Sequence, residues 1–154
     1  MDAESERLRS GLRNLSHQHA ALIWRAHKAG ESLNVEDRRL AARMAAHPEW
    51  ETWWQSADDL GDAETVTPDG VNPFACIAVE AAAEGLIVEN RHAADAYRAM
   101  KRDGQSHDDA RAEIGRALLG VIWEAEHRGV DPAQRLRAVF RQMERGASTT
   151  EIFC

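Results

Sequence analysis

The stretch NPFACIAVEAAAEGLIVE, residues 72–89, is the most apolar part of the chain and decides the predicted fold. Asn72 followed by Pro73 is typical of a helix start, because asparagine caps free backbone amides and proline suits the first helical position. A helix from Pro73 to Glu89 would be apolar on almost every side. We therefore expect it to be buried on most of its surface.

Three polar residues interrupt this apolar helix at intervals of four. Cys76, Glu80 and Glu84 therefore stack along one face. A buried carboxylate needs a partner, and two like charges at this spacing repel each other. Three arrangements would stabilise them: water at the edge of the helix, a cation bound among them, or an arginine from another helix. The residues alone leave these alternatives open.

Apolar residues recur at helical spacing on both sides of this segment. The predicted helices cover residues 4–29, a second begins after Asn34, a third begins at Pro48, and the later ones begin after Asn90, Ser106 and Asp131. Residues 58–71 are predicted to form a surface loop, and residues 147–154 a flexible tail. No strand pattern competes. The prediction is an all-α, compact single domain, residues 1–154, of five to seven helices. The Pro73–Glu89 and Ser106–Gly129 helices would form a central antiparallel pair.

Composition narrows the function classes. The net charge of −7 argues against nonspecific nucleic-acid binding, and the arginines form no polybasic block for a membrane surface. No apolar run reaches 18 residues, and the acidic N-terminus lacks the regions of a signal peptide. Two cysteines, Cys76 and Cys154, do not make a disulfide framework. These features predict a cytoplasmic protein.

Four of the five tryptophans lie in the first third of the chain, at Trp24, Trp50, Trp53 and Trp54. Such large side chains either anchor the early helices to the core or mark a surface for a partner. A small helical core needs bulky residues, which favours the first interpretation.

Several segments together resemble a bacterial group, domain of unknown function family 1841. They are WRAHKAG (24–30), AHPEW (46–50), VNPF (71–74), IG (114–115) and IWEA (122–125), with Gly129 closing the set. Each motif is weak by itself, but their order and spacing extend from about residue 20 to 145. The chain is therefore identified as a divergent member of this family.

The resemblance implies a metal site between two helices, built from histidines and carboxylates. The positions that match its ligands are Cys76, Glu80 and Glu84 on one helix and Asp108, Ala112 and Gly120 on the other. Cys76, Glu80, Glu84 and Asp108 are chemically possible ligands, and a thiolate with carboxylates would suit Zn or Fe. Ala112 and Gly120 carry no donor atom, so the implied site is degenerate unless Glu113 or His107 replaces them.

Two functions follow from these residues. The first is a non-catalytic accessory or binding protein with a decayed metal site and no cofactor, acting through a protein partner or self-association. The second is a protein that binds Zn or Fe through Cys76, Glu80, Glu84 and Asp108. One form of this hypothesis is a redox-active protein. No catalytic motif occurs in the sequence, which favours a protein that is not an enzyme.

Overall fold

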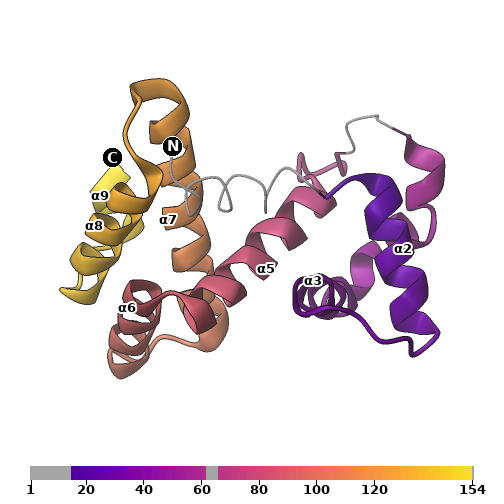
Figure 1. Ribbon diagram of the computed structural model, residues 1–154, viewed down its shortest axis with the longest axis horizontal. Coiled ribbons are helices and arrows are strands. Elements are labelled where there is room, and N and C mark those ends of the chain that lie inside the picture. The colour runs from indigo at the N-terminus through magenta and orange to yellow at the C-terminus, as the bar shows by residue number, and fades with distance from the viewer. Residues whose placement is uncertain (1–14, 62–65, 154) are drawn as a thin grey trace. The chain divides into compact units, whose positions relative to one another are not determined.

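The computed structural model describes residues 15–61 and 66–153, and all regular structure in these ranges is helical (Figure 1). The α-helices are α2 (His17–Lys28), α3 (Val35–Ala45), α4 (Glu51–Gln55), α5 (Pro73–Glu89), α6 (Arg91–Arg102), α7 (His107–Arg128), α8 (Pro132–Glu144) and α9 (Thr149–Phe153). Two 3-10 helices, η1 (Pro48–Trp50) and η2 (Ala57–Leu60), lie beside α4 in sequence. The all-α prediction is confirmed. The described ranges hold eight α-helices, one more than the upper limit of the prediction, because the five residues of α9 lie in the segment that was predicted to be a flexible tail.

The helix starts follow the capping residues predicted from the sequence. The side chains of Asn34, Asn90, Ser106 and Asp131 each accept a hydrogen bond from a backbone amide in the first turn of the helix that follows. Asn72 does the same for the amides of Phe74 and Ala75. For α2 the cap is Ser16. The part of the predicted first helix that covers residues 4–14 lies outside the described residues.

The chain divides into two compact units, and each has its own core. In the N-terminal unit, described at residues 15–61 and 66–81, α2 packs on α3, α4 and η2 (Figure 1). Its core contains two large indoles, because Trp54 and Trp24 are 1% and 6% exposed. These two tryptophans therefore anchor the early helices, as the composition predicted. The remaining core side chains are small or aliphatic, and Phe74 and Ile77 come from the start of α5.

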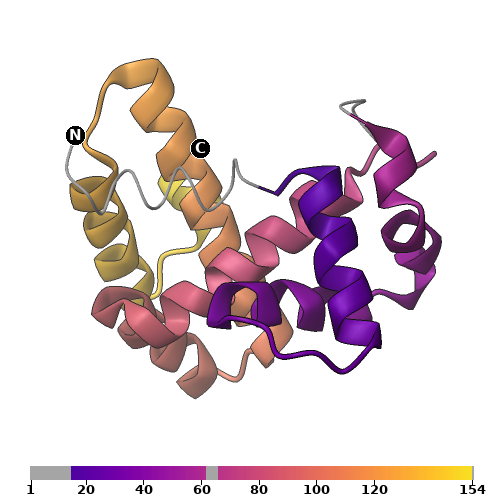
Figure 2. The ribbon, with the colours of Figure 1, turned by 45° about the vertical axis from the view of Figure 1, so that its right-hand side comes forward.

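In the C-terminal unit, residues 82–153, α6, α7 and α8 pack against one another and stay side by side in both ribbon views (Figures 1 and 2). The core contains alanines of α6, Ile114 and Val121 of α7, and four large side chains of α8: Leu136, Val139, Phe140 and Met143. The one tryptophan of this unit, Trp123, is 49% exposed and stacks on His127. Small residues on α6 let α8 approach closely, which explains the position of its large apolar side chains.

Helix α5 supplies both cores, and this explains why it is apolar on almost every side. Its first half gives Phe74 and Ile77 to the core of the N-terminal unit. Its second half gives Ala83, Leu86 and Ile87 to the core of the C-terminal unit. A helix that serves two cores needs apolar residues in more than one direction.

The predicted loop and tail have local structure. Residues 58–60 belong to η2, residues 62–65 lie outside the described residues, and the amide of Thr67 donates to the carbonyl of Val71 in a turn. Residues 149–153 form α9, which packs on α7 and α8. The flexibility of the tail and the single domain stay predictions. Of the helices described, none has the length and apolar character needed to cross a membrane.

Candidate functional site

Glu80 lies in a cluster within the N-terminal unit that we call the Glu80 cluster: Glu80, Arg43, His47 and Cys76. The Nε–H of Arg43 donates to Oε2 of Glu80 over 2.8 Å. Nε2 of His47 lies 3.0 Å from Oε1 and 2.9 Å from Oε2 of the same carboxylate. Because a carboxylate only accepts hydrogen bonds, Nε2 must carry the proton.

The partners of Glu80 determine its ionisation. Burial alone would raise the pKa of Glu80, but hydrogen bonds and positive charge from Arg43 and His47 outweigh burial and hold its pKa below the ordinary value. The carboxylate is only 23% exposed and the Arg43 side chain 17%. Glu80 therefore stays ionised, and its negative charge is balanced by side chains of its own unit.

His47 is positioned by the residues that follow it. It precedes Pro48 at the start of η1, and its ring stacks on Trp50 with centroids 4.4 Å apart. Trp50 makes an edge contact with Trp54, and Trp54 makes another with Phe74 at the start of α5. This row of rings connects the end of α3 to the helix that carries Glu80, and so it orients the imidazole toward the carboxylate.

Cys76 lies one helical turn before Glu80 and is partly buried. Burial raises the pKa of its thiol, and the nearby charge of Glu80 raises it further. The thiol is therefore protonated at neutral pH, whereas both metal binding and nucleophilic attack require the thiolate.

Glu84 lies in a second cluster, within the C-terminal unit, that we call the Glu84 cluster: Glu84, His107, Tyr97, Arg111 and Asp108. Oε1 of Glu84 lies 2.9 Å from Nε2 of His107 and 3.4 Å from an Nη of Arg111. The hydroxyl of Tyr97 lies 2.8 Å from Nδ1 of the same imidazole. In the tautomer whose Nε2–H donates to Glu84, Nδ1 accepts a hydrogen bond from the Tyr97 hydroxyl, so the three side chains form one hydrogen-bonded chain.

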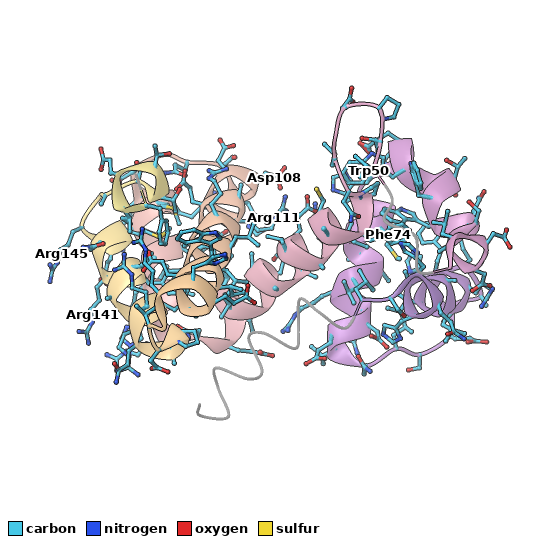
Figure 3. The ribbon with its side chains drawn as sticks, turned by 90° about the horizontal axis from the view of Figure 1, so that it is seen from above. Trp50, Phe74, Asp108, Arg111, Arg141 and Arg145 are labelled. Atoms are coloured by element: carbon cyan, nitrogen blue, oxygen red, sulfur yellow. The ribbon has the colours of Figure 1, made fainter. Side chains whose placement is uncertain are left out.

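Arg111 is the buried member of this cluster. Its side chain is 8% exposed, and one Nη lies 3.1 Å from Oδ1 of Asp108, which is itself 78% exposed. Figure 3 shows Asp108 and Arg111 close together near the start of α7. Within the described part of the chain, the Nε of Arg111 has no hydrogen-bond partner. The guanidinium is therefore held by two carboxylates, one half-buried and one in solvent.

The structure assigns partners to every predicted metal ligand that is a carboxylate. Glu80 pairs with Arg43, Glu84 with Arg111, and Asp108 with the same Arg111. Of the three arrangements considered for α5, the arginine from another helix is the one found. Among the residues described, no group of three or more His, Cys, Asp or Glu side chains is arranged to hold a metal ion. The Zn or Fe site formed by Cys76, Glu80, Glu84 and Asp108 stays a prediction.

The two replacement donors considered for the implied site are also engaged. His107 binds Glu84, as described above. Glu113 accepts hydrogen bonds from the amide and hydroxyl of Thr149 and pairs with Arg116 over 2.7 Å. Burial acts to raise the pKa of Glu113, but these hydrogen bonds bring it below the ordinary value. Glu113 therefore holds the start of α9.

The two donor-free positions of the late helix have different surroundings. Ala112 is exposed. Gly120 faces the ring of Phe153, and a Cβ at position 120 would lie 2.7 Å from two carbons of that ring. The guanidinium of Arg135, which pairs with Glu124, lies over the Phe153 ring, 5.7 Å from its centre. A ligand side chain at position 120 would therefore displace α9.

The sequence analysis considered an arginine from another helix and His107 as a donor, but it did not identify Arg43, His47 or Arg111 as the partners of Glu80 and Glu84. Arg43 and His47 are four residues apart, and so are His107 and Arg111. That spacing places a histidine and an arginine on neighbouring turns, where both can reach one carboxylate.

The fold and these clusters define a class: an all-helical protein in which the carboxylates of one apolar helix are paired with arginine and histidine of the same chain. The chain belongs to the DUF1841 family, described as a domain of unknown function, which matches residues 13–141. This confirms the resemblance. No curated protein and no solved structure matches the chain.

Proposed function

We propose that this chain is a non-catalytic helical accessory protein of the cytoplasm that acts by binding a protein partner or a second copy of itself. In this proposal the metal site implied by the family resemblance is degenerate. The observation that supports it best is that Glu80 and Glu84 of α5 each have their own arginine, Arg43 for Glu80 and Arg111 for Glu84. A divalent cation would have to bind beside a fixed guanidinium, and the repulsion between the two opposes binding.

The remaining donors also support a degenerate site. A metal ligand must be deprotonated, whereas burial and the charge of Glu80 favour the protonated thiol of Cys76. Glu113 is held by Thr149 and Arg116. Ion pairs and hydrogen bonds within the chain thus take the place that a metal ion would have in stabilising these side chains.

The experiment is elemental analysis with native mass spectrometry of freshly purified, untagged protein. We expect no stoichiometric Zn or Fe, and we expect a chelator to leave the thermal midpoint unchanged. The matched variants are Glu84→Ala and Asp109→Ala, since Asp109 is an exposed acidic residue two positions after His107. One Zn or Fe per chain that is lost in Glu84→Ala and kept in Asp109→Ala would overturn the proposal. It would establish instead the metal protein built on Cys76, Glu80, Glu84 and Asp108.

A further inference from the structure

The exposed face of α8 carries a row of three arginines with the same charge. Arg137 and Arg141 of α8 and Arg145, the residue that caps its C-terminus, are four residues apart and all exposed, and Figure 3 shows Arg141 and Arg145 pointing away from the helices. Four residues along a helix correspond to a rise of about 6 Å, so the guanidinium groups lie on successive turns of one face. We call these three residues the α8 arginine row.

The row lacks the partners that other arginines of the same unit have. Arg98 pairs with Asp95, Arg116 with Glu113, and Arg135 with Glu124. No hydrogen bond, ion pair or ring contact joins a residue of the row to any described side chain. The sequence of α8 offers one acidic side chain, Glu144, and glutamine or alanine elsewhere on the exposed face.

The charges of the row repel one another, although the C-terminal end of the helix dipole favours positive charge at Arg141 and Arg145. Like charges at a spacing of four residues repel each other along a helix. An ordinary solvated helix face mixes both signs, as the Arg98–Asp95 and Arg116–Glu113 pairs do. A row of one sign is relieved when a surface of the opposite sign binds to it.

We propose that the α8 arginine row is the docking surface for an acidic helical segment of a protein partner, with carboxylates on successive turns. The match is geometric as well as electrostatic, because an acidic helix with the same spacing places one carboxylate opposite each guanidinium. The inference rests on the proposed function as a binding protein and gives the chemistry of the partner.

The negative net charge of the chain favours a short acidic helix as the partner over a larger polyanion. Charges at physiological salt act over a Debye length of about 8 Å, so a short helix on α8 responds to the row. A long nucleic acid or a membrane surface extends well beyond that distance and meets a chain whose net charge is −7. The local row therefore attracts a short acidic segment, whereas the whole chain repels an extended one.

The test is fluorescence anisotropy with a labelled synthetic helix that carries glutamates at three positions four residues apart. A peptide of the same composition, with its glutamates spread around the helix, is the probe control. We expect the first peptide to bind at least about tenfold tighter at 0.15 M salt. The variant R137Q/R141Q/R145Q should lose that preference.

The control variant R91Q/K101Q/R102Q removes the same charge from exposed positions of α6 in the same unit. We expect it to keep the peptide affinity within about threefold. Circular dichroism checks that both triple variants are folded. If R137Q/R141Q/R145Q is not folded, the single variant R141Q replaces it, and we expect an intermediate loss of peptide affinity. Failure of the peptide to bind, equal losses in both triple variants, or tighter binding of a 20-nucleotide strand or phosphatidylserine vesicles would overturn the proposal. Metal content is measured separately, so the two proposals can fail independently.

Discussion

Phe153 packs its ring directly onto the backbone of Gly120, so closely that a Cβ at position 120 would be 2.7 Å from two ring carbons. Two opposing effects therefore act on a substitution at this position. In the interior of a helix, alanine is more favourable than glycine by about 1 kcal/mol. It also pushes away the ring on which α9 docks.

The effect of Gly120→Ala on the free energy of unfolding should therefore differ between the wild type and a Phe153→Ala protein. Gly120→Ala should stabilise a Phe153→Ala protein by about 0.5–1 kcal/mol and should be neutral or destabilising in the wild type. The resulting coupling, on the order of 1 kcal/mol, is measured by a double-mutant cycle in urea. Additive effects of the two substitutions would show that Phe153 does not occupy this position in solution.

The Glu80 cluster predicts a pH dependence of stability. The pKa of Glu80 is lower in the folded chain than its ordinary value, so its stabilising contribution is complete above about pH 4.3 and is lost as pH falls through the folded pKa. Glu80→Gln should therefore flatten the loss of stability below about pH 4.3. At pH 7 it should cost about 1–2 kcal/mol, since Arg43 and His47 lose a charged acceptor. Urea unfolding between pH 3 and 7 measures both effects, and an unchanged acid slope would contradict the ion pair.

In the Glu84 cluster, two ion pairs of the same guanidinium can be compared for their contribution to stability. Glu84 and Asp108 both bind Arg111, but their side chains are 26% and 78% exposed. Glu84→Gln should cost about 1–3 kcal/mol, because it leaves a buried arginine without its half-buried carboxylate. Asp108→Asn should change stability by less than about 0.5 kcal/mol. Equal costs in thermal or urea unfolding would show that burial does not decide which ion pair matters here.

Cys76 should react slowly with alkylating reagents. Burial and the charge of Glu80 raise the pKa of its thiol, and alkylation requires the thiolate. In a Cys154→Ser background we expect iodoacetamide to modify Cys76 more slowly than a cysteine in a short peptide at pH 8. Removing the charge in Glu80→Gln should speed the reaction, and urea should bring it to the peptide rate. A folded protein that reacts as fast as the peptide would contradict the protonated thiol.

Removing the central charge of the α8 arginine row should stabilise the chain. Arg141 has a like charge four residues away on each side, at Arg137 and Arg145, and each such pair costs about 0.2–0.5 kcal/mol. Arg141→Gln should therefore raise the free energy of unfolding by a few tenths of a kcal/mol at low salt, with a smaller gain in 0.5 M salt. Urea unfolding at the two salt concentrations measures it. A loss of stability would show that the favourable interaction of Arg141 with the C-terminal end of the helix dipole exceeds the repulsion.

The helices could be predicted from the sequence because their signals are local. Asn34, Asn72 and Ser106 cap the turns that follow them, and each capping bond joins residues at most three positions apart. The helix predicted to begin at Pro48 is found as η1 followed by α4, whereas α9 was missed because its five residues are too few to show a hydrophobic period.

The candidate site was predictable only in part, because its partners are distant in sequence. The spacing of Glu80 and Glu84 showed that both carboxylates needed a partner. It did not show that the partners are 33–37 residues away for Glu80 and 23–27 for Glu84. Which arginine reaches which carboxylate depends on how the helices pack, and that information is absent from local patterns.

The separate placement of the indoles gives the two units different optical signals. Trp24 and Trp54 lie in the core of the N-terminal unit, whereas Trp123 is half-exposed in the C-terminal unit. Tryptophan emission should therefore shift mainly when residues 15–81 unfold, while far-ultraviolet ellipticity follows the helices of both units. If the two transitions coincide in urea, the units unfold cooperatively, and if the emission changes first or last, each unit unfolds by itself. The intrinsic chromophores thus make the cooperativity of the chain measurable without a label.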